Sequence, residues 1–258
     1  MLSDDEIDRY ARHLVLKEIG GAGQMRLKAA RVAIVGMGGI GSPAALYLAA
    51  AGVGTLGLVD DDMVSLSNLQ RRCCMPRPRS AHRRRKPPPQ LKAINPYTDY
   101  IEHRIRLGTD NAADILSQYD IVLDGCDNFE TRLLVNRVCH DLKIPLVSAA
   151  IGRWSGQLSV FDGAPCYQCL VPEIPPDADT CERVGVVGAL AGVIGSLAAL
   201  EAVKLITSAG EPLTGRLLIF DGLTMTSRIV APASRSGLPG LRSRPFRAIV
   251  AAIITCQG

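Results

Sequence analysis

The stretch Arg31-Val-Ala-Ile-Val35-Gly-Met-Gly-Gly-Ile-Gly41 decides the fold. Its first five residues form a short apolar run bounded by glycine, which is the pattern of a buried strand. The turn that follows has the spacing Gly36-x-Gly38-x-x-Gly41 and leads into a run of small residues that favours a helix. A second apolar run occupies residues 55–59. Strand, glycine turn, helix and strand form one βαβ unit, whose crossover we expect to be right-handed.

This glycine turn is typical of a nucleotide site. Its glycines permit a tight turn and let backbone N–H groups approach a phosphate at the helix N-terminus. Asp60 ends the second strand, nineteen residues after Gly41, where such folds bind a ribose hydroxyl. A purely structural glycine turn is the alternative, and the motif alone does not distinguish NAD from ATP.

The alternation of strands and helices continues along the chain. We expect further strands at residues 101–105, 120–124, 145–148, 157–161 and 216–220, and helices at residues 3–29, 111–118 and 131–142. The pattern predicts an α/β fold: a Rossmann-like sheet with a parallel nucleotide-binding half, an antiparallel extension and N-terminal helices. Residues 1–258 are interpreted as a single domain.

Composition supports an ordered, cytoplasmic protein. The chain has 258 residues, of which 47% are hydrophobic and 21% charged, so extensive disorder is excluded. The N-terminus is acidic and shows no secretory signal, and the eight cysteines therefore favour reduced thiols, metal binding or catalysis over disulfides. Residues 184–200 carry no charge, but the run is short for a membrane span and contains four glycines. We interpret it as a buried helix and expect no membrane partner.

Residues 60–71 read Asp-Asp-Asp-Met-Val-Ser-Leu-Ser-Asn-Leu-Gln-Arg, and this segment resembles the signature of the ubiquitin-activating-like adenylyltransferases, the HesA/MoeB/ThiF family. Four more segments resemble the same family in the same order. They are Arg9-Tyr-Ala-Arg12, Leu123-Asp-Gly-Cys-Asp-Asn128, Cys166-Tyr-Gln-Cys169 and Thr180-Cys-Glu-Arg-Val-Gly-Val-Val-Gly188. The resemblance covers residues 3–71 and 91–230 and is closest to the MoeB branch, the molybdopterin-synthase adenylyltransferases.

The resemblance implies an ATP- and Mg²⁺-dependent enzyme that adenylates the C-terminal glycine of a small ubiquitin-like sulfur-carrier protein. The MoeB branch implies a MoaD-like carrier and molybdenum cofactor biosynthesis. The alternatives are activation of the thiamine carrier ThiS, as in ThiF, and a defective relative that only binds. An NAD-dependent oxidoreductase is disfavoured because the chain offers no catalytic His and no Tyr-x-x-x-Lys. No nucleic acid is expected as a partner.

The resemblance also implies the site residues. Asp127 follows a parallel strand, where α/β folds place ligands, and matches the family residue that holds Mg²⁺ and phosphates; capping of the helix near Phe129 is the alternative. Arg12 matches an arginine that enters the ATP site of a partner subunit, which implies a homodimer, although the pattern alone indicates only a surface side chain. The residues expected to bind the nucleotide are Gly36, Gly38, Gly39, Gly41, Asp60, Asp62, Ser67, Asn68, Leu69, Gln70, Arg71, Asp127 and Asn128.

The cysteines divide into three groups. Cys166 and Cys169 have zinc-ligand spacing, but the second pair that completes the family's zinc site is missing, and the tail offers only Cys256. Free thiols are the alternative for this pair. Cys181 matches a family cysteine implicated in thioester or persulfide chemistry, and a nearby cation would lower its pKa. The remaining two of interest, Cys126 and Cys139, are interpreted as core residues.

Two segments depart from the family pattern. Residues 72–90 contain five prolines, seven cations and no Val, Ile, Leu or aromatic residue, and residues 231–258 add four arginines and no acid. Without the seven cations of the first segment, the chain has 22 basic and 25 acidic side chains. The net charge of +4 is therefore due to this one segment, and the rest of the chain is mildly acidic. The resemblance implies an ordered Gly-x-Pro-Lys in the first segment, whose lysine contacts ATP. That lysine is missing, and Arg84 is the cation nearest to its position when residues are counted along the chain. A disordered basic loop that binds an anionic partner is one interpretation.

A shifted reading frame is the other interpretation. Codons for Gln-Val-Leu-His-Ala give Arg72-Cys-Cys-Met-Pro76 when one base is dropped, and codons for Gly-Ala-Pro-Lys-Ala-Glu give Ala81-His-Arg-Arg-Arg-Lys86 when read one base late. Codons for Ala-Cys-Pro-Val-Cys-Gly similarly give Gly237-Leu-Pro-Gly-Leu-Arg242 when read one base early. We hypothesise that both segments are out-of-frame translations, which resequencing of the gene would decide.

Overall fold

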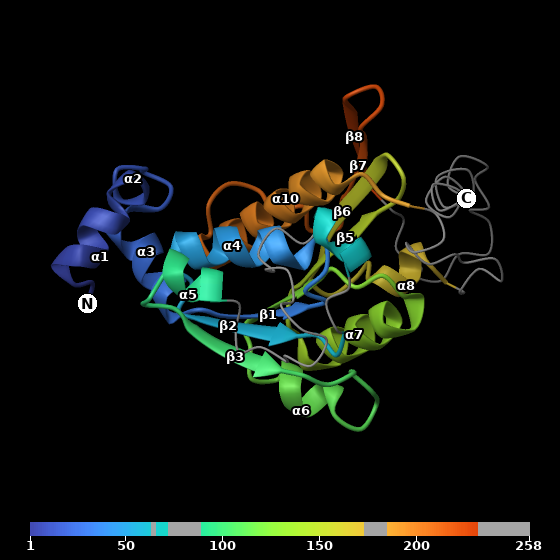
Figure 1. Ribbon diagram of the computed structural model, residues 1–258, viewed down its shortest axis with the longest axis horizontal. Coiled ribbons are helices and arrows are strands. Elements are labelled where there is room, and N and C mark those ends of the chain that lie inside the picture. The colour runs from blue at the N-terminus through green and yellow to red at the C-terminus, as the bar shows by residue number, and fades with distance from the viewer. Residues whose placement is uncertain (63–65, 72–88, 173–184, 232–258) are drawn as a thin grey trace.

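An eight-stranded sheet forms the centre of the computed structural model, which describes residues 1–62, 66–71, 89–172 and 185–231 (Figure 1). The strand order is β3-β2-β1-β4-β5-β6-β7-β8; neighbours pair in parallel from β3 to β5 and antiparallel from β5 to β8. This confirms the predicted parallel half with an antiparallel extension. The strands are β1 (Arg31–Val35), β2 (Thr55–Val59), β3 (Asp99–His103), β4 (Ile121–Asp124), β5 (Leu146–Ile151), β6 (Ser155–Phe161), β7 (Leu217–Asp221) and β8 (Thr226–Val230).

Helices cover both faces of the sheet (Figure 1). One core joins the sheet to α4 and α10, and a second core joins the other face to α6 and α7. The helical segments are α1 (Asp4–Arg9), α2 (Ala11–Leu14), α3 (Gly20–Ala29), α4 (Gly41–Ala51), η1 (Leu66–Arg71), α5 (Pro89–Ile94), α6 (Ala112–Leu116), α7 (Phe129–Leu142), α8 (Tyr167–Leu170) and α10 (Gly188–Thr207).

The N-terminal region is helical but not continuous over residues 3–29. The predicted capping box is present, because Ser3 and Glu6 exchange side-chain-to-backbone hydrogen bonds at the start of α1. Turns separate α1, α2 and α3, and Gly20 begins α3 with a φ of +56°. The predicted single helix is therefore corrected to three, and the positive φ of Gly20, which a right-handed helix does not continue through, explains the break before α3.

Helix α10 confirms the interpretation of the uncharged stretch as a buried helix from residue 188 onward. A Cβ on Gly195 would lie 2.5 Å from the carbonyl oxygen of Ile40, so this glycine lets α10 pack closely against the start of α4. Gly192, in contrast, faces open space. Within the described residues α10 is the one helix long and apolar enough to cross a membrane. Its buried residues belong to the core shared with α4, β5 and β6.

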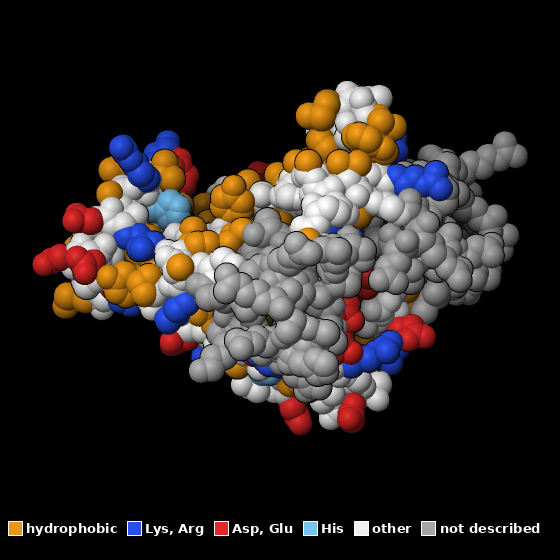
Figure 2. All heavy atoms as spheres, in the orientation of Figure 1, with side chains coloured by type: hydrophobic (Ala, Val, Ile, Leu, Met, Phe, Trp, Pro, Cys, Tyr) orange, Lys and Arg blue, Asp and Glu red, His pale blue; other side chains and the backbone are white. Residues whose placement is uncertain are grey.

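The hairpin of β7 and β8 projects from the antiparallel end of the sheet and exposes apolar side chains (Figure 2). Leu223 and Met225 occupy its turn, and Ile229 lies on β8. Strand β8 was not predicted, because four of its five residues are exposed and its sequence lacks a buried face.

Candidate functional site

The glycine turn connects β1 to α4 and has the geometry that the motif predicts. Gly36 has a φ of +83°, and a Cβ at Gly41 would lie 1.9 Å from the carbonyl oxygen of Gly36, so both positions require glycine. Among the described residues no atom lies within 4 Å of a would-be Cβ on Gly38, so there is room beside this glycine for a ligand. At the N-terminus of α4 the N–H of Ser42 donates to the carbonyl oxygen of Gly38 at 3.1 Å, and Pro43 has no N–H. The backbone N–H groups that could meet an anion are therefore those of the turn itself, up to Gly41.

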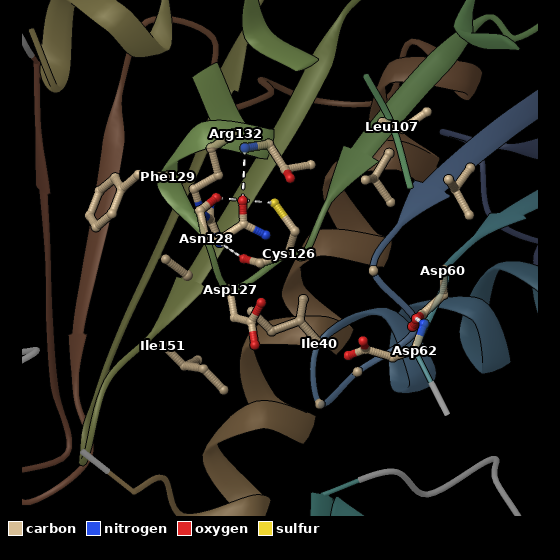
Figure 3. A pocket seen from close by; sticks show the side chains of 18 of the residues that line it. Ile40, Asp60, Asp62, Leu107, Cys126, Asp127, Asn128, Phe129, Arg132 and Ile151 are labelled. Carbon is tan, nitrogen blue, oxygen red and sulfur yellow. Dashed lines mark hydrogen bonds between the residues drawn. The ribbon is translucent and has the colours of Figure 1, made fainter. Parts of the chain in front are cut away.

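A cavity of about 280 Å³ opens at the carboxyl ends of the parallel strands (Figure 3). It lies where β1 separates β2 from β4, the point at which the strand order reverses and doubly wound sheets bind ligands. Of the predicted residues, those that line the cavity are Gly36, Gly38, Gly39, Asp60, Asp62, Arg71, Asp127 and Asn128. The structure thus brings three separate motifs together at one edge of the sheet.

Three of the predicted residues that the structure describes do not line this cavity. Gly41 packs beneath the turn, and Leu69 and Gln70 lie on η1 without lining the cavity. The side chains of Ser67 and Asn68 fall outside the described residues, as does Cys181. Apolar Ile105 and Leu107 and the exposed Arg106 complete one wall, and the sequence did not single them out.

Asp60 fastens the glycine turn to the end of β2. Its carboxylate accepts a hydrogen bond from the backbone N–H of Met37 at 2.8 Å and another from that of Asp62 at 2.8 Å. These bonds give Asp60 a structural role beside the predicted ribose contact, which stays a prediction.

Asp127 faces the cavity, with Asp60 and Asp62 on the other side (Figure 3). Asn128 caps α7, because its side-chain oxygen accepts from the N–H of Thr131 at 2.8 Å. The alternative interpretation of Asp127 as the helix cap is therefore wrong. Asp127 is exposed and has no hydrogen bond or ion pair within the described residues, so its carboxylate is available to a ligand.

A buried ion pair supports the loop that carries Asp127. Arg132 on α7 and Asp124 at the end of β4 are 6% and 1% exposed, and their charged atoms are 3.1 Å apart. Burial raises the pKa of the Cys126 thiol well above its ordinary value, and the Asp124 carboxylate acts in the same direction. The prediction of Cys126 and Cys139 as core residues is confirmed, since both are buried.

No sequence motif singled out Arg132. Helical spacing could have revealed it. Arg132 lies four residues after Asn128 and seven before Cys139, which places it on the stripe of α7 that faces the core. A cation on such a stripe requires a buried acidic partner, and Asp124 ends the neighbouring strand.

The charges around the cavity favour a divalent cation together with a polyphosphate. Among the described residues, four carboxylates line the cavity, from residues 60–62 and Asp127, together with the guanidinium groups of Arg71, Arg106 and Arg132. Arg132 forms an ion pair with Asp124. The carboxylates contributed by the described part of the chain would repel a polyphosphate that arrived without a cation. Carboxylate oxygens are ligands that Mg²⁺ prefers, and the Asp127 carboxylate, which has no partner in the described part of the chain, fits that role.

Cys166 and Cys169 are the two candidate zinc ligands, which make up half of the family's ligand set. Their sulfur atoms lie 3.9 Å apart, close to the ~3.8 Å expected for two thiolates on one tetrahedral zinc. Burial by itself raises the pKa of Cys166, but hydrogen bonds from Asn136 and from backbone N–H groups lower it below its ordinary value overall. Cys139 lies in the core, where burial raises its pKa to about 12, so it supplies no third ligand.

We predict that the chain with this sequence binds zinc weakly. Two thiolates leave two tetrahedral positions open, and structural zinc sites normally hold four protein ligands. Metal analysis after mild chelation should find well below one zinc per chain. Near-stoichiometric zinc that resists the chelator would contradict this and would point to ligands outside the described residues, such as Cys181 or Cys256.

Arg12 lies far from the cavity of its own chain. It is exposed on α2, which begins directly after Tyr10. Tyr10 packs against Gly52, because a Cβ on Gly52 would lie 2.7 Å from the Tyr10 hydroxyl. Gly52 ends α4, whereas the cavity is at the beginning of α4, and eleven helical residues span ~16 Å. Figure 1 shows α1 and α2 at the end of the sheet from which the parallel strands start.

Comparisons with known proteins agree with this architecture. Residues 10–238 match the ThiF family. Over 236 residues the chain is 44% identical to the adenylyltransferase and sulfurtransferase MOCS3 of Aedes aegypti, an alignment that covers 88% of this chain and 53% of MOCS3. Over 242 residues it is 44% identical to the probable adenylyltransferase/sulfurtransferase MoeZ of Mycobacterium tuberculosis, covering 89% of this chain and 61% of MoeZ. The chain thus spans between half and two thirds of these relatives.

Solved structures share the fold at lower sequence identity. Escherichia coli MccB superposes with a TM-score of 0.77 at 19% identity, covering 94% of this chain and 74% of MccB. PaaA superposes with a TM-score of 0.75 at 21% identity, covering 90% and 75%. MccB has also been solved with ATP, and that structure gives a TM-score of 0.72 at 21% identity, covering 87% and 72%. With its strand order, its glycine turn and a family match over most of its length, the chain belongs to the ThiF family.

Proposed function

We propose that this protein is an ATP-dependent adenylyltransferase that activates the C-terminal glycine of a small ubiquitin-like sulfur-carrier protein. The observation that carries the proposal is the convergence of the glycine turn, Arg71 and the exposed Asp127 on one cavity. The relatives MOCS3 and MoeZ, both named as adenylyltransferases, support it. We further propose that the carrier is MoaD-like, which would place the protein in molybdenum cofactor biosynthesis in the cytoplasm.

The reaction joins the carrier's carboxylate oxygen to the α-phosphorus of ATP and breaks the bond from that phosphorus to the bridging oxygen, releasing pyrophosphate. The N–H groups of the glycine turn, up to Gly41 at the first position of α4, would bind phosphate oxygens. Arg71 would stabilise the charge that develops at the α-phosphate. Mg²⁺, when bound, would neutralise phosphate charge and orient the leaving group, and Asp127 would hold it there.

The ~280 Å³ cavity offers one apolar wall for the base, formed by Ile105 and Leu107. Asp60, at the end of β2, lies where a ribose hydroxyl is bound in this class of fold. The position of Arg12 supports a homodimer in which each Arg12 completes the site of the other chain, because α2 is too distant from its own cavity.

The decisive experiment is ATP–pyrophosphate exchange with two carriers, one MoaD-like and one ThiS-like. The proposal predicts exchange that requires a carrier with a free C-terminal glycine and is faster with the MoaD-like protein. Faster exchange with the ThiS-like carrier would favour the thiamine branch. ATP binding without exchange with either carrier would favour a relative that only binds.

We predict that the chain with this sequence adenylates its carrier far more slowly than a variant that carries an in-frame Gly-Ala-Pro-Lys segment within residues 72–90. Residues 72–88 lie outside the described residues, so the prediction depends on sequence alone. The family lysine must be preorganised to contact ATP, and a cation without a packed anchor supplies charge but not fixed geometry. ATP binding should persist and be sensitive to salt. Equal exchange rates for the two versions would show that another cation replaces the lysine.

A further inference from the structure

We propose that Arg132 is a positioning residue for Asp127. The inference deepens the proposed function and rests on it, because it concerns how the Asp127 carboxylate is held at the cavity. Arg132 itself is buried and already paired, so its role is to hold a loop in place.

The guanidinium of Arg132 bridges three parts of the fold. It donates to the Asp124 carboxylate at 3.1 Å, to the carbonyl oxygen of Ala149 on β5 at 2.7 Å, and to the carbonyl oxygen of Cys126. It also lies 3.3 Å from the Ser148 hydroxyl. Cys126 immediately precedes Asp127. The hydrogen bond from Arg132 to the Cys126 carbonyl oxygen therefore fixes the peptide group from which Asp127 extends (Figure 3).

Asp124 holds the same loop from its other side. Its carboxylate accepts from the backbone N–H of Cys126 at 3.0 Å and from the Cys126 thiol at 2.7 Å. Both the N–H and the C=O of Cys126 are therefore tied to one buried ion pair. The loop also touches the glycine turn, because a Cβ on Gly36 would lie 3.1 Å from the Cys126 backbone. A shift at Cys126 would move Asp127 relative to the phosphate-binding turn.

Stability alone explains this arrangement poorly. Replacing a buried ion pair by apolar residues of similar volume is often neutral or stabilising, so the pair is weak evidence for a stability role. The guanidinium supplies five donors in a rigid planar fork, which matches acceptors that converge from two strands and a loop. A lysine at this position would keep the charge opposite Asp124 but could not reach all the acceptors from one nitrogen.

The test is the Mg²⁺-dependent part of nucleotide binding, measured by calorimetry with a non-hydrolysable ATP analogue in the presence and absence of Mg²⁺. For Arg132→Lys we expect the tightening that Mg²⁺ produces to fall about tenfold, which corresponds to ~1.4 kcal/mol. Binding without Mg²⁺ should stay within about twofold. Arg137→Lys, on the exposed face of the same helix, is the matched control and should change neither.

A double-mutant cycle separates positioning from general destabilisation. In an Asp127→Asn background, Arg132→Lys should alter Mg²⁺-dependent binding by less than about twofold, because its effect passes through the lost carboxylate. Two results would overturn the inference. One is an equal effect of Arg132→Lys on Mg²⁺-dependent binding in the wild-type and Asp127→Asn backgrounds, and the other is a folded Arg132→Lys variant whose Mg²⁺-dependent binding is unchanged. If Arg132→Lys fails to fold, Ser148→Ala replaces it in the same cycle, with an expected effect of about threefold in the same direction and no effect as the contrary result.

These outcomes are distinguishable from failure of the proposed function. A wild-type chain that binds no Mg²⁺-nucleotide contradicts the proposed function and the inference together. A wild-type chain that binds the analogue with Mg²⁺ but adenylates no carrier contradicts the proposed function alone, and the cycle still decides the role of Arg132.

Discussion

Replacing Asp127 by asparagine is expected to lower ATP–pyrophosphate exchange by about 10²–10³-fold, the range found when one preorganised electrostatic contact to a transition state is removed. The substitution keeps the shape of the side chain and removes its charge. Asp127 is exposed and has no partner within the described residues, so the fold should not depend on it. The loss should therefore appear in the rate at saturating ATP and carrier, with an unchanged melting temperature.

The matched control is Asp141→Asn, which removes an exposed carboxylate from the far end of α7. It should leave exchange within about twofold of the wild-type rate. A titration with Mg²⁺ adds a second readout, because loss of a metal ligand should raise the Mg²⁺ concentration that gives half-maximal exchange. Exchange by Asp127→Asn within about threefold of the wild type would show that this carboxylate does not serve the reaction.

The nucleotide-binding half of the fold was predictable because its signals are local. Strands β1 and β2 begin and end where the apolar runs do, since each run is buried on both faces and bounded by a polar residue or a glycine. Strand β3 was placed two residues late, because its residues are only partly buried and its pattern does not mark an end. The edge strand β8 escaped prediction for the same reason.

The site was predictable only in part, because several of its features depend on contacts between distant segments. Asp127 and Asn128 are both good capping residues, so sequence alone does not reveal which of them caps α7 and which faces the cavity. The role of Arg132 depends on Asp124 and Ala149, which reach it through the pairing of β4 with β5. The wall formed by Ile105 and Leu107 carries no motif at all.

Arg12 is expected to act on the cavity of a partner chain, and the geometry within one chain is the reason. The cavity and α2 lie at opposite ends of α4, and the ~16 Å that separates the ends of this helix exceeds the reach of one arginine side chain. If Arg12 contributes to catalysis, it must therefore come from a second copy. Arginines that enter an active site from another chain contribute about 10³–10⁵ in rate in phosphoryl transfer, so Arg12→Ala should be nearly inactive.

Mixed dimers test this directly. A dimer of one Arg12→Ala chain and one Asp127→Ala chain contains one site with an intact Asp127 and, from the other chain, an intact Arg12. Exchange should recover to about half of the wild-type rate per dimer, because one of the two sites is complete. Homodimers of each variant should stay inactive, and Lys17→Ala, an exposed cation beside α2, should need no complementation. If Arg12 acted within its own chain, every site in the mixed dimer would lack one residue, and purified heterodimers would show no recovery.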